Sequence, residues 1–180
     1  MITMVDMKVV NMVSTTRLGE YFDLIDVADV LGIDYHPEQF PGMTYRIENP
    51  KVCVLLFRSG RAVATGAKSP EDAEKAFEIV HKQLKDNDFE PWSSYEIILS
   101  NVVVTHDVGR PLNLAHLTLA LPMVRTEWEP EQFPGLIYRL KDASAVCLIF
   151  SSGKCVITGN TSLEEAQQAV DSLIADLASL

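Results

Sequence analysis

The sequence predicts an α+β protein made of two direct repeats, residues 1–91 and 92–180, each with the element order β-α-β-β-β-β-α. Three observations support this prediction: a segment of the first half recurs in the second, turn residues separate strand-like apolar segments, and each half closes with a capped amphipathic helix. We expect the halves to pair edge to edge in one curved antiparallel sheet, with the helices covering one face.

The duplication is the strongest of these observations. Residues 36–42, HPEQFPG, return as EPEQFPG at residues 129–135, a shift of 93 positions. Between 36–76 and 129–169 the halves are identical at 19 of 41 positions without a gap. Each element expected in one half is therefore expected in the other.

Each half opens with a strand and a short helix. The strand is expected over Met7 to Thr16 and Tyr95 to Thr105, and the helix over Glu20 to Leu31 and Leu112 to Leu121. In the first half, turn residues then separate strand-like segments at Met43 to Ile47, Lys51 to Phe57 and Arg61 to Thr65.

An amphipathic helix closes each half. Ser69 and Ser162 are expected to cap these helices, with Pro70 at the first helical position of one and a capping-box spacing from Ser162 to Glu165 in the other. Apolar residues then recur every three or four positions: Ala73, Phe77, Val80 and Leu84, and Ala166, Val170, Leu173 and Leu177.

Two strand segments, Val52 to Phe57 and Ala145 to Phe150, are apolar on both faces. A sheet covered on one side normally alternates apolar and polar residues. One face should meet the helices, so the other is either an apolar binding face or the floor of a second buried layer. We favour the binding face, because each half offers only two helices.

The composition excludes several classes of protein. With 180 residues, 47% of them hydrophobic, and apolar runs of strand length, the chain is neither disordered nor membrane-spanning. Met1 to Lys8 lacks the pattern of a signal peptide, so we expect a cytoplasmic protein. Cys53, Cys147 and Cys155 lack metal-ligand spacing and are expected to be small buried side chains, and four scattered histidines form no cluster.

Catalytic motifs are missing from the sequence. It contains no P-loop, no GxGxxG after a strand, no HExxH and no nucleophile elbow. We expect a protein that is not an enzyme, takes no cofactor or small-molecule substrate and binds no membrane.

Charge is unevenly distributed along the chain. The net charge of −10 by itself argues against nucleic acid. Residues 40–68, however, contain five basic residues and one acidic residue, a net of +4, and residues 133–161 contain three and one, a net of +2. A phosphate backbone is therefore expected to lie on the sheet, away from the acidic helices.

These features resemble the family of TATA-box-binding proteins in their short archaeal form. The resemblance covers nearly the whole chain and rests on EQFPGxxYR, then Phe-x-Ser-Gly-[Arg/Lys], then Val-x-Thr-Gly, each present twice. It implies a saddle of ten antiparallel strands whose concave face lies in an opened minor groove, with helices on the convex face. The family is itself a standard example of kinking DNA with apolar wedges, so this geometry comes from the resemblance alone.

The resemblance also implies the DNA contacts. The wedges would be Phe40, Phe57, Phe133 and Phe150, and the phosphate contacts Arg46, Arg61, Arg139 and Lys154. The minor-groove contacts would be Asn11, Val13, Leu55, Val63, Thr65, Asn101, Val103, Leu148, Val156 and Thr158. The amides suit this role because A·T edges present acceptors, and a close apolar surface gives the guanine amino group no partner.

The function implied is that of a general transcription initiation factor in the nucleoid, which kinks the TATA element and recruits transcription factor B and, indirectly, RNA polymerase. Glu129, Glu131 and Gln132 match the family's contact with factor B. Two alternatives stay open. The net charge of −10 favours a protein-interaction scaffold that has lost DNA binding, and the divergent first half favours a specialised paralogue with altered promoter preference.

Overall fold

The computed structural model describes residues 7–180 and divides into two compact units. Asn11–Ser100 form one, here called the first unit; Asn101–Leu180 with residues 7–10 form the second unit. The expectation that the chain has no signal peptide rests partly on residues 1–6, which lie outside the described residues. No helix within residues 7–180 is long and apolar enough to cross a membrane.

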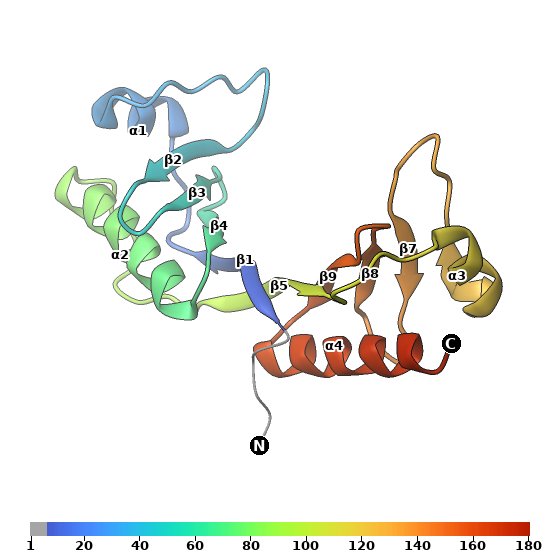
Figure 1. Cartoon of the computed structure of the whole chain (residues 1–180). Coiled ribbons are helices and arrows are strands. Elements are labelled where there is room, and N and C mark those ends of the chain that lie inside the picture. Colours follow the sequence, from blue (N-terminus) through green and yellow to red (C-terminus); the bar gives the residue numbers. More distant parts are fainter. Residues whose placement is uncertain (1–6) are drawn as a thin grey trace. The chain divides into compact units, whose positions relative to one another are not determined.

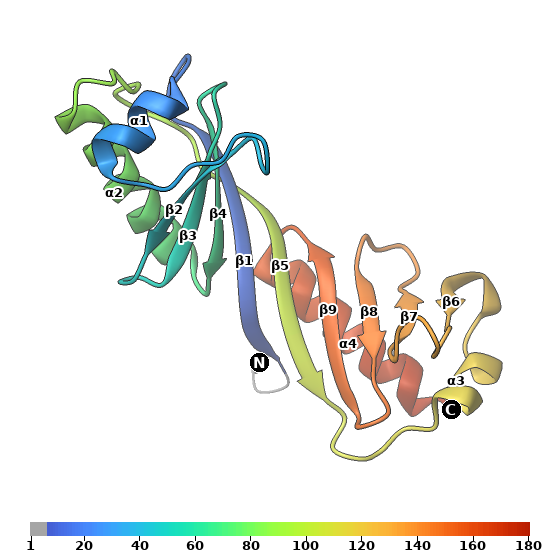
Figure 2. The same cartoon turned by 90° about the horizontal axis from the view of Figure 1, so that it is seen from above.

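The first unit holds an antiparallel sheet with α2 packed on one face (Figures 1 and 2). Its strands follow the order β2-β3-β4-β1. Its elements are β1 (Lys8–Arg17, of which residues 11–17 belong to this unit), α1 (Leu24–Leu31), β2 (Met43–Ile47), β3 (Val52–Leu56), β4 (Arg61–Ala67) and α2 (Pro70–Asp86).

The second unit repeats this plan with one more strand. Its strands follow the order β5-β9-β8-β7-β6, and α4 lies along one face of them (Figure 1). Its elements are β5 (Ile98–Asp107), α3 (Leu114–Ala120), the 3₁₀ turn η2 (Met123–Arg125), β6 (Thr126–Glu127), β7 (Leu136–Arg139), β8 (Val146–Ile149), β9 (Lys154–Asn160) and α4 (Leu163–Ala178).

The α+β class is confirmed, but residues 7–180 form nine strands rather than ten. The missing strand is the counterpart of β6, at residues 33–34. Gly32 caps α1 in the left-handed conformation, and the N–H of Ile33 donates to the carbonyl of Ala28 at 2.8 Å. That N–H closes the helix and is not free to pair with β2. In the second unit, the matching Thr126 pairs with Tyr138.

Both short helices begin later than the apolar pattern predicts. Asp23 Oδ1 accepts the N–H groups of Ile25 and Asp26, so α1 begins at Leu24. In the same way, Asn113 Oδ1 accepts the N–H of His116. A side-chain cap defines each start, and the residues before it remain outside the helix.

The closing helices match the prediction. Ser69 Oγ accepts the N–H of Asp72, and Ser162 Oγ accepts that of Glu165. The Glu165 carboxylate does not bond the N–H of Ser162, as a capping box would require. It accepts hydrogen bonds from the N–H and the hydroxyl of Thr161 instead, and these bonds lower the pKa of Glu165. All eight predicted core residues of α2 and α4 are buried.

The two faces of each sheet differ in burial. In β3, Val52, Val54 and Leu56 are buried beneath α2, whereas Cys53 and Leu55 are half-buried. The same alternation runs through β8 and β9. The faces opposite α2 and α4, here called the open faces, therefore carry apolar side chains without a covering helix in the described part of the chain.

Candidate nucleic-acid interface

A row of side chains crosses the open face of each unit. In the first, Leu55 pairs with both Thr44 and Val63, and Val63 pairs with Thr15. In the second, Leu148 pairs with Ile137 and Val156, and Val156 with Thr105. The register thus brings the predicted groove residues Leu55 and Val63, and Leu148 and Val156, directly side by side.

Sequence reasoning missed the ends of these rows. Ile137 extends the apolar row of the second unit, and Thr15 and Thr105 close the rows with a hydroxyl. A signal was present, because Thr15 and Thr105 recur at the same shift of 90 as Asn11 and Asn101. Period-2 alternation from those asparagines places Val13 and Thr15, and Val103 and Thr105, on the open faces.

Each open face carries one asparagine amide in a defined orientation. Asn11 Oδ1 accepts the N–H of Gly66 at 2.7 Å, and Asn101 Oδ1 accepts that of Gly159 at 2.9 Å. Because the oxygen is held by a backbone donor, each NH₂ group is available as a donor. One N–H points to the hydroxyl of Thr65 at 3.4 Å or of Thr158 at 3.2 Å.

The glycines that hold these amides lie at irregularities in the sheet. The register shifts between Met12 and Ser14, and again between Val102 and Val104. Opposite these shifts, Gly66 and Gly159 have φ of +94° and +91°, which side-chain-bearing residues rarely adopt. The repeated Thr-Gly of the sequence is therefore the backbone device that orients Asn11 and Asn101.

Two aromatic pairs stand beside the open faces. The rings of Phe40 and Phe57 lie 6.0 Å apart at 66°, and those of Phe133 and Phe150 lie 5.8 Å apart at 67°. Phe40 and Phe133 keep 44% and 38% of their surface exposed. Each pair is edge-to-face, so the rings support one another without being buried in the core.

Sequence reasoning missed two glycines beneath these rings. A Cβ on Gly42 would lie 2.7 Å from Phe40 Cε2, and a Cβ on Gly135 would lie 2.7 Å from Phe133 Cε2. Any side chain there would displace the exposed ring. The signal was the Pro-Gly that follows Phe in both repeats.

The predicted phosphate contacts are all exposed. Arg46 and Arg61 lie on β2 and β4, and Arg139 and Lys154 on β7 and β9. None of these four side chains forms an ion pair with an acidic residue within residues 7–180. Their charges remain available to an anion.

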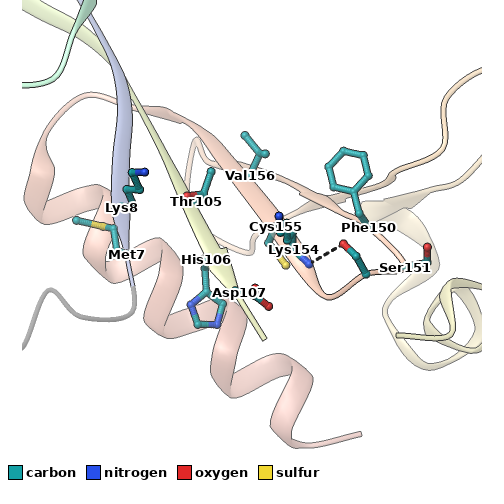
Figure 3. A pocket seen from close by; sticks show the side chains of 11 residues that line it. Met7, Lys8, Thr105, His106, Asp107, Phe150, Ser151, Lys154, Cys155 and Val156 are labelled. Carbon is teal, nitrogen blue, oxygen red and sulfur yellow. Dashed lines mark hydrogen bonds between the residues drawn. The ribbon is translucent and has the colours of Figure 1, made fainter. Parts of the chain in front are cut away.

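Two hollows join two of these cations, Arg46 and Lys154, to the open faces. One, of about 820 Å³, is lined by Arg46, Lys51, Lys68 and Thr65 among others. The other, of about 760 Å³, brings Lys154 together with Phe150, Val156 and Thr105 (Figure 3). Figure 3 shows Thr105, Val156 and Phe150 projecting from the same side of the strands.

The three predicted partner contacts, Glu129, Glu131 and Gln132, are exposed on the loop between β6 and β7. The carbonyl of Glu129 accepts the N–H groups of Gln132 and Phe133, both at 2.9 Å. The same turn therefore positions the acidic residues and the exposed Phe133.

The three cysteines do not form a metal site within the described residues. Cys147 and Cys155 are buried, and burial raises the pKa of their thiols to about 12 and about 11, whereas Cys53 is half-buried. Within residues 7–180, no group of three or more histidine, cysteine or acidic side chains could hold a metal ion.

The fold and its open faces define a class: a duplicated α+β protein with a donor amide, an apolar row and an aromatic pair repeated in each unit. The family model described as transcription factor TFIID, or TATA-binding protein (TBP), matches residues 6–87 and 96–180. The chain belongs to this family, which is one of transcription factors and not of enzymes.

Individual relatives agree with the family match. The TATA-box-binding protein of Methanocaldococcus jannaschii is 47% identical over 170 residues, 94% of this chain and 92% of the relative. That of Methanothermobacter thermautotrophicus is 44% identical over 179 residues, 99% and 98% of the two chains. A solved structure, "Methanococcus jannaschii TBP", superposes with a TM-score of 0.87 at 45% identity and covers 97% of this chain and 99% of its own.

Proposed function

We propose that the protein is a general transcription initiation factor that binds the TATA element in the minor groove and kinks it. Each repeat, 1–91 and 92–180, supplies one half of the DNA contact. The repeated, oriented asparagine amide within an apolar open face carries this proposal.

The open faces have the chemistry that A·T base pairs require. In the minor groove these pairs present only acceptors, at adenine N3 and thymine O2, whereas guanine adds an amino donor. Asn11 and Asn101 each offer an N–H donor. Leu55, Val63, Leu148 and Val156 offer the guanine amino group no acceptor, so a G·C pair would leave that group desolvated and unpaired.

The aromatic pairs supply the wedges. Partial unstacking of a base step costs on the order of a few kcal/mol and is offset when bending brings more surface into contact. Phe40 and Phe133 are exposed before any ligand binds, and each is supported by the ring of Phe57 or Phe150. Insertion therefore needs little rearrangement of the protein.

The exposed cations fix the protein on the phosphates without reading sequence. In the same complex, Glu129, Glu131 and Gln132 bind transcription factor B, which brings RNA polymerase to the promoter. The protein acts on nucleoid DNA in the cytoplasm, with no cofactor.

A bandshift titration on a TATA duplex and on the same duplex made G·C-rich tests the proposal. We expect the protein to bind the TATA duplex more tightly, by about tenfold or more for every two base pairs changed from A·T to G·C. N11A/N101A should reduce this preference, because it removes both oriented donors, whereas H81A on α2 is the control and should retain it. Equal affinity of the unchanged protein for both duplexes would favour the scaffold alternative instead.

A further inference from the structure

The two loops that carry the exposed phenylalanines share a backbone but differ in charge. We call residues 34–42 the first stirrup loop and 127–135 the second stirrup loop. Residues 37–42 and 130–135 are identical in sequence, PEQFPG. The carbonyl of His36 accepts the N–H groups of Gln39 and Phe40 at 3.0 and 3.1 Å, as that of Glu129 accepts those of Gln132 and Phe133.

In the first stirrup loop, the imidazole of His36 lies between two carboxylates. Nε2 is 2.9 Å from Asp34 Oδ1, and Nδ1 is 3.4 Å from Glu38 Oε1. Both ring nitrogens face an acceptor, which only the protonated ring satisfies, and Asp34 and then Glu38 raise the pKa of His36. When it is protonated, the ring engages both carboxylates.

The matching positions of the second stirrup loop are Glu127, Glu129 and Glu131, and all three are exposed. Within residues 7–180 these carboxylates form no ion pair. The second stirrup loop therefore presents three carboxylates without an ion pair, and the first presents an imidazole between two carboxylates. The three positions of the second loop carry a charge of −3, whereas Asp34, His36 and Glu38 carry −1 with the imidazole protonated and −2 with it neutral. A basic partner is therefore attracted less strongly to the first loop than to the second.

We propose that His36 is a specificity-determining residue that weakens the attraction of a basic partner surface to the first stirrup loop and so directs that surface to the second. This inference rests on the proposed function, in which factor B binds the second stirrup loop. The identical PEQFPG segments give a partner nothing with which to tell the loops apart. Replacing a carboxylate by an imidazole at the wrong site provides the discrimination that shared contacts cannot.

The test uses the full chain bound to a TATA duplex and measures the affinity of factor B at fixed salt. E129R/E131R should weaken factor B binding by about tenfold or more. Adding H36E to that variant should recover a large part of the loss, because the first stirrup loop then has three carboxylates. The matched control, H36Q, removes the imidazole without adding a carboxylate and should recover less.

A second measurement uses the single variants. A cleavage reagent on factor B should cut one side of the TATA element with the unchanged protein and with H36Q, and both sides with H36E. If E129R/E131R leaves factor B binding intact, the proposed site and this inference are both wrong. If E129R/E131R abolishes binding but H36E neither restores it nor yields cuts on both sides, the proposed site stands and the inference alone is wrong.

Discussion

Asn11 and Asn101 act as donors because of one backbone N–H each. A free amide can present either its oxygen or its nitrogen, but the N–H groups of Gly66 and Gly159 occupy the oxygens. The chemistry of each site thus depends on a glycine. This glycine directly follows the threonine whose hydroxyl oxygen accepts a hydrogen bond from the asparagine NH₂ group. A side chain at either glycine would disturb the φ that aims this N–H.

The aromatic pair of Phe133, which is exposed, and Phe150, which is half-buried, leads to a prediction at the same scale. F133A and F150A should each weaken TATA binding and reduce the DNA bend, since one ring of the edge-to-face pair is lost. The lost ring contact alone should lower the free energy of unfolding by about 0.5–1.5 kcal/mol. The apolar surface that each ring buries adds to this loss. Both variants should still fold, because these rings lie outside the core. A fluorescence bend assay and urea unfolding measure the two effects. Normal bending by both variants would show that these rings are not wedges.

Arg139 leads to a prediction about salt. R139A should weaken binding to TATA and unrelated duplexes alike, and make the slope of log K against log salt shallower by roughly one unit. Lys82 on α2 pairs with Asp86, so K82A is the matched control and should keep the original slope. An unchanged slope in R139A would place Arg139 away from DNA.

At the scale of elements, the second repeat has a hydrogen bond between a strand and a helix for which the first repeat has no counterpart at the matching tyrosine. Tyr138 on β7 is 1% exposed, and its hydroxyl donates to Asp176 Oδ2 on α4 at 2.6 Å. Its counterpart Tyr45 on β2 is half-buried and donates to no residue in the described part of the chain. The strand and helix of the second unit therefore have a polar link that the first unit lacks.

This link predicts a difference at alkaline pH. Burial, and then the bond to Asp176, raise the pKa of Tyr138 to about 12, from an unfolded value near 10. The group's contribution to stability is therefore complete below about pH 10 and is lost as pH rises towards 12. Y138F should lower the unfolding free energy by about 1 kcal/mol at pH 8.

Urea unfolding at pH 8 and pH 11 measures this contribution. The difference between the unchanged protein and Y138F should shrink at the higher pH. Y45F is the matched control and should lose less stability at pH 8. A loss in Y45F as large as that in Y138F would mean that the hydroxyl bond to Asp176 contributes nothing.

At the scale of the whole molecule, the two repeats orient their asparagine amides in the same way but carry different net charges on their sheet segments. The asparagine donors are held alike, so in the proposed complex we expect them to discriminate the two directions of an A·T site only weakly. The sheet segments 40–68 and 133–161 carry net charges of +4 and +2. We therefore expect the first repeat to attract phosphates more strongly than the second, although phosphate contacts do not distinguish one base pair from another.

We accordingly expect a modest orientational preference for the protein alone and a strong one once factor B binds. Cleavage reagents attached near each stirrup loop, mapped on a TATA duplex with and without factor B, measure both. Strong one-way binding by the protein alone would contradict this expectation. So would an unimpaired ternary complex with E129R/E131R.

The sequence by itself determined the duplication, the α+β class, the capped closing helices and the residue types of the candidate interface. These follow from local patterns, since period, cap and repeat are all visible in neighbouring positions. Only the tertiary structure decided which strand is missing, how the asparagine amides are oriented and why Gly42 and Gly135 lie beneath the rings. Each of these depends on a backbone N–H or a ring edge brought close by folding. The repeated Thr-Gly and Pro-Gly mark the positions in the sequence, but spacing along the chain does not give the direction in which such a group points.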